Sequence, residues 1–246
     1  MLLNLKSLHI CSNKLTCIPE SLSCLTQLVD LNVMCNQIKE LPSKIGLLCS
    51  LEKLGITSNH LTVLPNSLAA LTKLDRLDLE YNHLTLLPEN LETMFNCRIL
   101  IANHNRLIRL PRCLGRMPSL TSVSASQNKI KYIPSELCNS MTLKRIRLNN
   151  NEISALPSKI GDLKKLREIS VDYNKISELP MSFMHLTKLN LLRIEGNGLG
   201  RPTADVIRRG AVAVVDWCRE RYRENEVNRM RLIVSETQKL LHDITR

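Results

Sequence analysis

Aromatic residues are scarce in this chain. Phe, Trp and Tyr together make up 3% of its 246 residues, although hydrophobic residues as a whole make up 43%. Protein cores usually take much of their bulk from aromatic rings, so leucine and isoleucine must fill the interior, and a regular aliphatic stack is expected. The chain also lacks any run of about 18 or more apolar residues, so no membrane-spanning helix is expected. Its first residues show neither the basic stretch nor the apolar run of a secretory signal.

Cysteine pairs with the C-x-x-C spacing are missing, although the chain holds nine cysteines. An odd number of cysteines scattered along the sequence indicates free thiols in a reducing compartment. Asn-x-Ser/Thr glycosylation sites are absent as well, in spite of the many asparagines, which points the same way. These absences predict an intracellular, cytoplasmic protein.

A strict internal repeat runs through most of the chain. Asparagines recur every 23 residues, at Asn13, Asn36, Asn59, Asn82, Asn105, Asn128, Asn151, Asn174 and Asn197. A proline follows six residues after each of the first eight, and leucines or isoleucines keep the same period. Nine copies without an insertion indicate a repeat architecture, in which each unit buries its apolar face against its neighbours.

The residues of one unit predict its local structure. The Leu8-x-Ile10 segment alternates with period two, which is typical of a short strand with one buried face. Asn13 follows at the turn, where its amide could bond the backbones of neighbouring coils and form a ladder with its equivalents. Pro19 marks the departure from the sheet. The next leucines, Leu22 and Leu25, have the period-three spacing of a short helical or 3₁₀ turn.

The pattern L-x-x-L-x-L-x-x-N-x-L-x-x-L-P-x-x-L-x-x-L resembles the 23-residue class of leucine-rich repeats. That class occurs in Ras-pathway scaffolds, Scribble-like polarity proteins, plant Ras-group repeat proteins and Roco GTPases. The resemblance covers residues 2–202. It implies an α/β solenoid shaped as a curved horseshoe, with a parallel β-sheet on the concave face and short helical turns on the convex face. It also implies that other proteins bind on the concave face.

Two domains are expected: a solenoid over 1–202 and a C-terminal cap helix with a helical tail over 203–246. Leu2 already fits the last leucine position of a preceding repeat, so no N-terminal cap is evident. Terminal repeats normally need such a cap. Either the chain is a shortened product, or that end is covered by a partner or a second copy.

A helical pattern follows the last repeat, with one stripe through Val206, Gly210, Val214, Trp217 and Tyr222. It resembles the cap of some Roco-type repeat proteins but departs from it at Gly198 and Thr203, where that pattern has proline. Further on, a seam spaced three and four apart comprises Val227, Met230, Val234, Thr237, Leu241 and Ile244. The favoured interpretation is a helix that packs back on the solenoid, and the alternative is a short coiled coil.

The repeat phase predicts which side chains face a partner on the concave side. The candidates are Arg76, Asp78, Glu80, Tyr81, Ile99, Ile101, His104, Arg145, Arg147, Asp172, Tyr173 and Arg193. Ile99 and Ile101 place apolar side chains beside a floor of serines, and this pair is either a partner anchor or an ordinary exposed strand pair. Beneath them the core is thin, at Cys97, Ala102 and Ala125. Four bulkier residues are expected to refill it: Met94, Phe95, Met117 and Met141.

Positive charge is concentrated in the middle of the chain. The net charge is +11, and between Arg98 and Arg147 ten basic residues face one acid, Glu136. The patch that this predicts comprises Arg98, Arg106, Arg109, Arg112, Arg116, Lys129 and Lys131. It indicates an acidic protein partner or a solvated surface that aids solubility. Nucleic acid is disfavoured because no aromatic residues are interleaved for base stacking.

Catalytic patterns are not evident. Gly196-x-Gly198-x-Gly200 lacks the lysine and the third glycine of phosphate-binding loops, and His9, Cys11 and Cys35 lack metal-site spacing. The sequence therefore predicts a protein-binding scaffold or adaptor that is not an enzyme and carries no cofactor or metal. Its binding surface is expected around repeats four to eight. Two alternatives stay open: a component of a larger cytoskeletal or ciliary assembly, held by the N-terminal end or the C-terminal helix, and a regulator of a GTPase or phosphatase complex.

Overall fold

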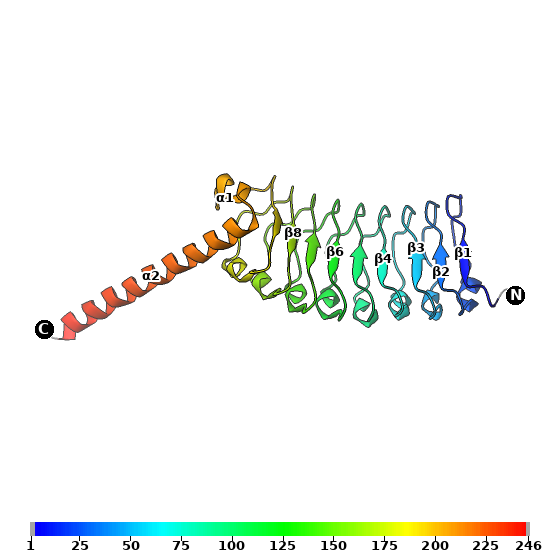
Figure 1. Ribbon diagram of the computed structural model, residues 1–246, viewed down its shortest axis with the longest axis horizontal. Helices are drawn as coiled ribbons and strands as arrows, with labels where there is room; N and C mark the ends of the chain where they lie inside the picture. Colours follow the sequence, from blue (N-terminus) through cyan, green and yellow to red (C-terminus); the bar gives the residue numbers. More distant parts are fainter. Residues whose placement is uncertain (1–2, 245–246) are drawn as a thin grey trace.

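Nine short parallel strands form one sheet in the computed structural model, which describes residues 3–244 with side chains to 239. The strands are β1 (Ser7–His9), β2 (Asp30–Asn32), β3 (Lys53–Gly55), β4 (Arg76–Asp78), β5 (Ile99–Ile101), β6 (Ser122–Ser124), β7 (Arg145–Arg147), β8 (Glu168–Ser170) and β9 (Leu191–Arg193). They lie side by side in chain order, and the coils stack in a row (Figure 1). The expected leucine-rich-repeat solenoid is confirmed.

The register follows from the repeat length. Ser7 lies opposite Asp30 and Asp30 opposite Lys53, so each strand residue faces its equivalent 23 positions along. Short 3₁₀ helices close the other side of the coils, as the period-three leucines predict. They are η1 (Glu20–Cys24), η2 (Ile45–Leu47), η3 (Asn66–Ala70), η4 (Leu91–Thr93), η5 (Arg112–Arg116), η6 (Ser135–Asn139), η7 (Ile160–Asp162) and η8 (Met181–His185).

From Asn36 onward, the repeated asparagines bond to the backbone of two successive coils. The Asn82 amide nitrogen donates to Leu79 O and Glu80 O of its own coil and to Ile56 O of the preceding one, and its oxygen accepts from Leu61 N. The residue before each asparagine is left-handed, with φ between 52° and 57° at eight coils and 66° at Gly196. This conformation aims the asparagine inward, where water does not satisfy the backbone groups of the turn.

The core is an aliphatic stack, in which Leu31, Leu77 and their equivalents from β2 to β8 are at most 6% exposed. Cys97, Ala102 and Ala125 are buried as expected, and Met94 and Met117 join them.

Two of the four expected core fillings are wrong. Phe95 is 57% exposed and Met141 is 80% exposed. Ser140 occupies the buried site instead, where its hydroxyl accepts a hydrogen bond from Leu143 N. The coil keeps its register at Ser140, and the residue after it therefore points outward.

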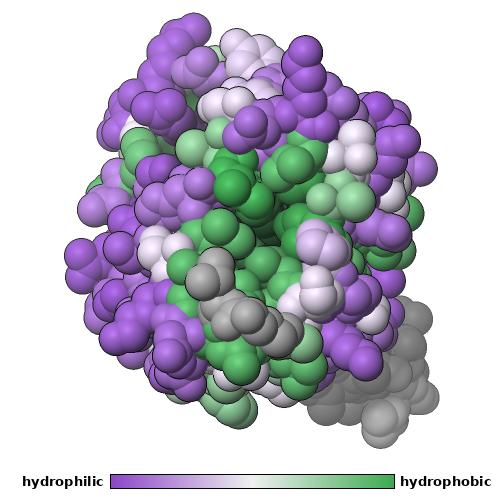
Figure 2. Space-filling model, turned by 90° about the vertical axis from the view of Figure 1, so that its right-hand side faces the viewer, coloured by the Kyte–Doolittle hydropathy of each residue, from purple (hydrophilic) through white to green (hydrophobic). Residues whose placement is uncertain are grey.

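The first described coil shows its apolar interior. Figure 2 looks onto this end of the molecule, where apolar side chains occupy the middle and hydrophilic ones the rim. Leu8 and Ile10 are only partly buried, whereas Leu31 and Val33 one coil further are fully buried. Leu2, on which the expectation of an uncapped first coil rests, lies outside the described residues.

Two helices follow the last strand, α1 (Ala204–Arg208) and α2 (Ala211–Ile244). α2 packs on η8 through Ala211, Val214, Val215 and Cys218, all of which are at most 5% exposed. Tyr222, expected in the buried stripe, is 41% exposed. Along the part of the chain that the structure describes, no helix is long and apolar enough to cross a membrane.

The distal half of α2 departs from the expectation that it packs back on the solenoid. It projects beyond the last coil (Figure 1), and Val227, Met230 and Val234 are each about half exposed or more. Thr237 is exposed as well, and the side chains of Leu241 and Ile244 lie outside the described residues. The helix is straight, so once it leaves η8 it has no route back to the coils.

All nine cysteines are free thiols in two environments. Cys11, Cys17, Cys24, Cys35 and Cys49 are exposed, whereas Cys97, Cys113, Cys138 and Cys218 are buried. Burial in apolar surroundings disfavours the charged thiolate. It raises the pKa of each of the four buried thiols to about 11.

Thiol labelling should therefore divide the cysteines into two groups. At about pH 8 the folded chain is expected to take up a maleimide rapidly at the five exposed cysteines, because the thiolate is the reacting species and these groups are accessible. The four buried cysteines should react only after denaturant is added. Mass spectrometry of the labelled peptides measures both rates. Rapid labelling of Cys97 or Cys218 in the folded chain would contradict the packing described above.

Candidate functional site

The outward side of the sheet carries the residues that the repeat phase singled out. We call this surface the strand face, meaning the outward side chains of β1–β9 together with the turn residues up to each left-handed position. Among the predicted residues, Arg76, Tyr81, His104, Arg145, Arg147, Tyr173 and Arg193 are exposed, whereas Asp78, Glu80, Ile99, Ile101 and Asp172 are partly buried. All of them lie on the strand face because they alternate with core residues such as Leu77 and Leu100.

The two isoleucines lie at the middle of the strand face. The parallel register sets Ile99 between Arg76 and Ser122, and Ile101 between Asp78 and Ser124. Since the serines are small and Ser122 is buried, they form a low floor beside the isoleucines. An apolar pair that stands above a neighbouring row of small serines can pack against a partner side chain of complementary shape.

An aromatic pair borders the same region. The rings of Tyr81 and His104 are stacked, with centroids 4.3 Å apart and planes 10° apart. Each occupies the left-handed position before its asparagine, with φ of 54° and 52°. Tyr173 has the same position and is 61% exposed. It lies four coils from Tyr81, or roughly 19 Å at the usual strand spacing, so the structure does not bring the two tyrosines together.

Arg145 and Arg147 are adjacent on β7 but differ in their bonding. Arg147 forms a two-point ion pair with Glu168, with Nε–Oε1 and Nη2–Oε2 distances of 2.5 and 3.1 Å. Glu168 is 8% exposed, so its carboxylate depends on that arginine. Arg145 is exposed and forms no side-chain ion pair with any described residue. Arg145 is therefore the arginine that β7 offers to a partner.

Most arginines of the basic patch are neutralised by acids of neighbouring coils. Arg98 pairs with Asp75, Arg109 with Glu89, Arg112 with Glu136 and Arg116 with Glu92. Hydrogen bonding to Arg116 is the main cause that lowers the pKa of Glu92. Arg106, Lys129 and Lys131 have no ion pair within 4.0 Å among the residues that the structure covers. These three carry the positive charge that the patch leaves unpaired.

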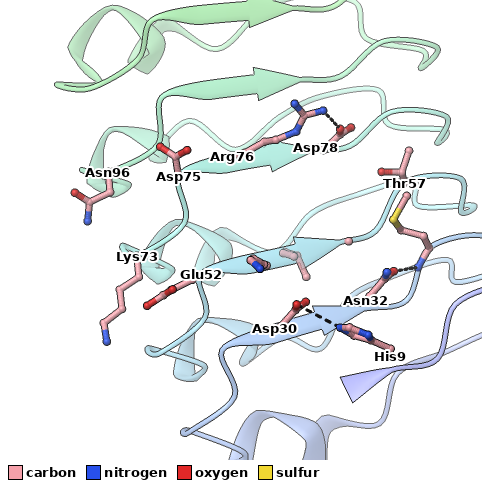
Figure 3. A pocket seen from close by; sticks show the side chains of 14 residues that line it. His9, Asp30, Asn32, Glu52, Thr57, Lys73, Asp75, Arg76, Asp78 and Asn96 are labelled. Carbon is pink, nitrogen blue, oxygen red and sulfur yellow. Dashed lines mark hydrogen bonds and ion pairs between the residues drawn. The ribbon is translucent and has the colours of Figure 1, made fainter. Parts of the chain in front are cut away.

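A hollow of about 770 Å³, which the sequence did not predict, lies on the strand face of the first four coils (Figure 3). It opens over Gly55, the one strand position on this face with no side chain, between the His9–Asp30 and Arg76–Asp78 ion pairs. A Cβ at Gly55 would come within 2.8 Å of Asn32 Oδ1. The signal available from the sequence was this glycine in a row where other coils carry larger residues.

The groups around the hollow do not converge as a catalytic site would. Charged residues there pair with one another, His9 with Asp30 and Arg76 with Asp78 (Figure 3). The hydroxyl that bonds to His9, Ser7 Oγ at 3.2 Å from Nε2, is exposed to solvent and not enclosed by the hollow. Elsewhere on the strand face, burial raises the pKa of Asp172, whose carboxylate accepts from Glu195 N. Over residues 3–239 no group of three or more His, Cys, Asp or Glu side chains could hold a metal ion. The geometry offers shape and charge for binding.

Sequence models of three families match the chain. They are described as leucine-rich repeat region over residues 123–204, leucine rich repeat over 27–84 and leucine rich repeat over 4–25, together more than half of the chain. No curated protein matches.

Many solved structures resemble this one. A leucine-rich-repeat protein of Leptospira interrogans is 31% identical with a TM-score of 0.77, over 85% of this chain and 53% of that one. The ectodomain of the Arabidopsis thaliana membrane receptor kinase GASSHO1/SCHENGEN3, in complex with Casparian Strip Integrity Factor 2, is 33% identical with a TM-score of 0.71, over 80% and 24%. The functional domain of InlJ from Listeria monocytogenes, at 24% identity and a TM-score of 0.67 over 82% and 42%, shares the fold. The chain thus spans about half of the first protein and about a quarter of the second.

Proposed function

Because this chain belongs to the leucine-rich repeat proteins, we propose that it is a non-enzymatic scaffold or adaptor that holds a protein partner on its strand face, between β4 and β8. The observation that carries this proposal is the partly buried pair Ile99 and Ile101, set between charged β4 and the serine floor of β6. Binding energy in protein interfaces concentrates in a few apolar or aromatic anchors that exclude water. The stacked Tyr81–His104 pair adds such an anchor at the border.

Known binding by a relative supports the mode of recognition. The receptor ectodomain that resembles this chain is described in complex with a partner factor. Nine strands at the usual spacing give the strand face a length on the order of 40 Å, enough for a standard protein interface. The Gly55 hollow adjoins the proposed region at Arg76 and Asp78 and would accommodate a protruding side chain of the partner.

We further propose that the partner presents acidic groups. Arg145 is exposed without an ion pair to a described residue, and so are Arg106, Lys129 and Lys131 near the edge of the sheet. Exposed charges at the rim of an interface mainly set the association rate and its dependence on salt. Nine free thiols support a reducing, cytoplasmic setting for this encounter.

Serine substitution of the isoleucine pair tests the proposed site. The change Ile99→Ser with Ile101→Ser copies what β6 already carries at the two equivalent positions, so the fold should tolerate it. We expect partner capture to weaken by at least about tenfold, because an anchor typically contributes more than 1 kcal/mol. Affinity capture with quantitative mass spectrometry identifies the partner, and titration with that partner measures the loss.

The matched control is Val63→Ser with Leu86→Ser. These two side chains are 58% and 40% exposed and lie outside the strand face, so the control removes as much apolar surface elsewhere. Capture should be retained by this control and by a chain trimmed of residues 223–246. The strand face would be rejected as the binding site if partner capture fell equally in the isoleucine variant and the control. It would also be rejected if capture fell only after residues 223–246 were removed. Arg147 is not suitable for substitution, because its loss would leave buried Glu168 unpaired.

A further inference from the structure

The free half of α2 has an apolar face that the solenoid does not use. From Arg223 to Lys239 every side chain except partly buried Glu226 is exposed. Val227, Met230 and Val234 border a shallow hollow of about 500 Å³ along the helix, with Glu226 and Arg231 at its rims. Their spacing of three and four continues through Thr237, Leu241 and Ile244 in the sequence. An a/d seam of this kind is the pattern by which helices pair.

The seam is not a continuation of the face that docks on the solenoid. At 3.6 residues per turn each residue advances by about 100°, so the centre of the seam is turned roughly 120° from the docked face. The docked face comprises Ala211, Val214, Val215 and Cys218. A helix lying along the seam would therefore stand beside the solenoid and not against it, and both surfaces could be occupied at once.

We propose that a second copy of this chain covers the seam, as a parallel two-stranded coiled coil formed by the distal halves of α2. The register of the flanking charges selects both the partner and its direction. With Val227 at an a position, Glu226 takes the g position and Arg231 takes the e position of the next heptad. In parallel pairs a g residue faces the following e residue of the other helix.

Two symmetrical Glu226–Arg231 ion pairs therefore form between identical parallel helices. In the antiparallel arrangement of the same seam, e positions face e positions, so Arg231 would face Gln238 and gain no acid. The contact that Glu226 makes within its own helix, to Arg229 at 3.8 Å, is long and exposed and therefore a weak competitor. The seam spans about 18 residues, or roughly 27 Å of helix, so the association is expected to be weak and dependent on concentration.

Sedimentation velocity of the full chain over a wide concentration range tests this inference. The unmodified chain should shift from monomer to dimer, and Val234→Lys should weaken the association by at least about tenfold, because it buries a charge in the middle of the seam. The control is Leu232→Lys, which places the same charge on an equally exposed apolar residue of the outer side. It should leave the dimer intact. A monomer at every concentration, or equal loss in both variants, would overturn the proposal.

The direction of the pair has its own test. Glu226→Arg and Arg231→Glu each place like charges across the seam, so each variant alone should dimerise at least about tenfold more weakly. A mixture of the two variants should recover association, because each arginine then meets an acid of the other chain. Failure of the mixture to associate, with the unmodified chain still dimeric, would overturn the parallel arrangement. Circular dichroism of each variant verifies that the solenoid remains folded.

Discussion

Replacing Asn82 by alanine is expected to destabilise the chain by about 2 kcal/mol or more. Its amide oxygen is the acceptor for the buried Leu61 N, and its nitrogen donates to Ile56 O of the preceding coil. Alanine leaves Leu61 N without an acceptor in a coil that water does not reach, which costs about 1–3 kcal/mol. It also removes one of the two hydrogen bonds to Ile56 O, which keeps the Asn59 amide as a donor. Urea unfolding, followed by circular dichroism, measures the change in the free energy of unfolding.

Asn13 provides the matched control within the same repeat position. Its amide donates only to Ile10 O and Cys11 O of its own coil, and the residue is exposed. Water can replace those hydrogen bonds, so Asn13→Ala should cost less than about 1 kcal/mol. Similar losses for Asn13 and Asn82 would show that the ladder does not stabilise the stack through bonds between coils.

A charge under the C-terminal helix is the second change with a large expected effect. Val214 is fully buried where α2 packs on η8, and Val214→Asp would place a carboxylate there without a partner. Burial of an unpaired charge, together with the lost apolar contact, is expected to cost about 3 kcal/mol or more. Because stability in a solenoid passes from coil to coil, the loss should be greatest in the last coils.

Hydrogen exchange resolved by mass spectrometry measures where that loss falls. In Val214→Asp, peptides from η8 and β9 should exchange much faster, and those from β2 to β4 should change least. Val212→Asp is the control, since Val212 lies two residues away on the same helix and is 66% exposed. It should leave exchange near that of the unmodified chain. Unchanged protection of η8 in Val214→Asp would show that α2 does not close the solenoid.

Charge along the sequence was a poor guide to charge on the surface. The stretch of sequence from Arg98 to Arg147 contains ten basic residues and a single acid, Glu136, so nearly every basic residue in it lacks an acidic neighbour along the chain. In the solenoid, however, the spatial neighbours of a residue lie about one repeat away, and Asp75 and Glu92 reach Arg98 and Arg116 from the preceding coils. A window that follows the chain omits those acids. A count by coil position would have shown that half of these ten basic residues meet an acid: Arg98, Arg109, Arg112, Arg116 and Arg147.

The free length of α2 was equally inaccessible from the pattern alone. A seam from Val227 onward is compatible with a helix that packs on its own coils or on another chain. Two observations decide between packing on its own coils and packing on another chain. They are the direction in which α2 leaves η8 and the rotation about the helix axis between its docked face and its seam. The hollow over Gly55 is a similar case, because its depth depends on side chains of the adjacent strands.

The repeat itself was determined by the sequence. A constant period of 23 residues dictates the parallel register, the row of inward asparagines and the outward position of Ile99 and Ile101, because each depends on local periodicity and on stacking of like upon like. Tertiary structure decided everything that depends on contacts between unlike positions. It paired Arg147 with Glu168 and left Arg145 without an ion pair to any residue that the structure describes, because ion pairs form between side chains that meet in space, across coils that are distant in the chain.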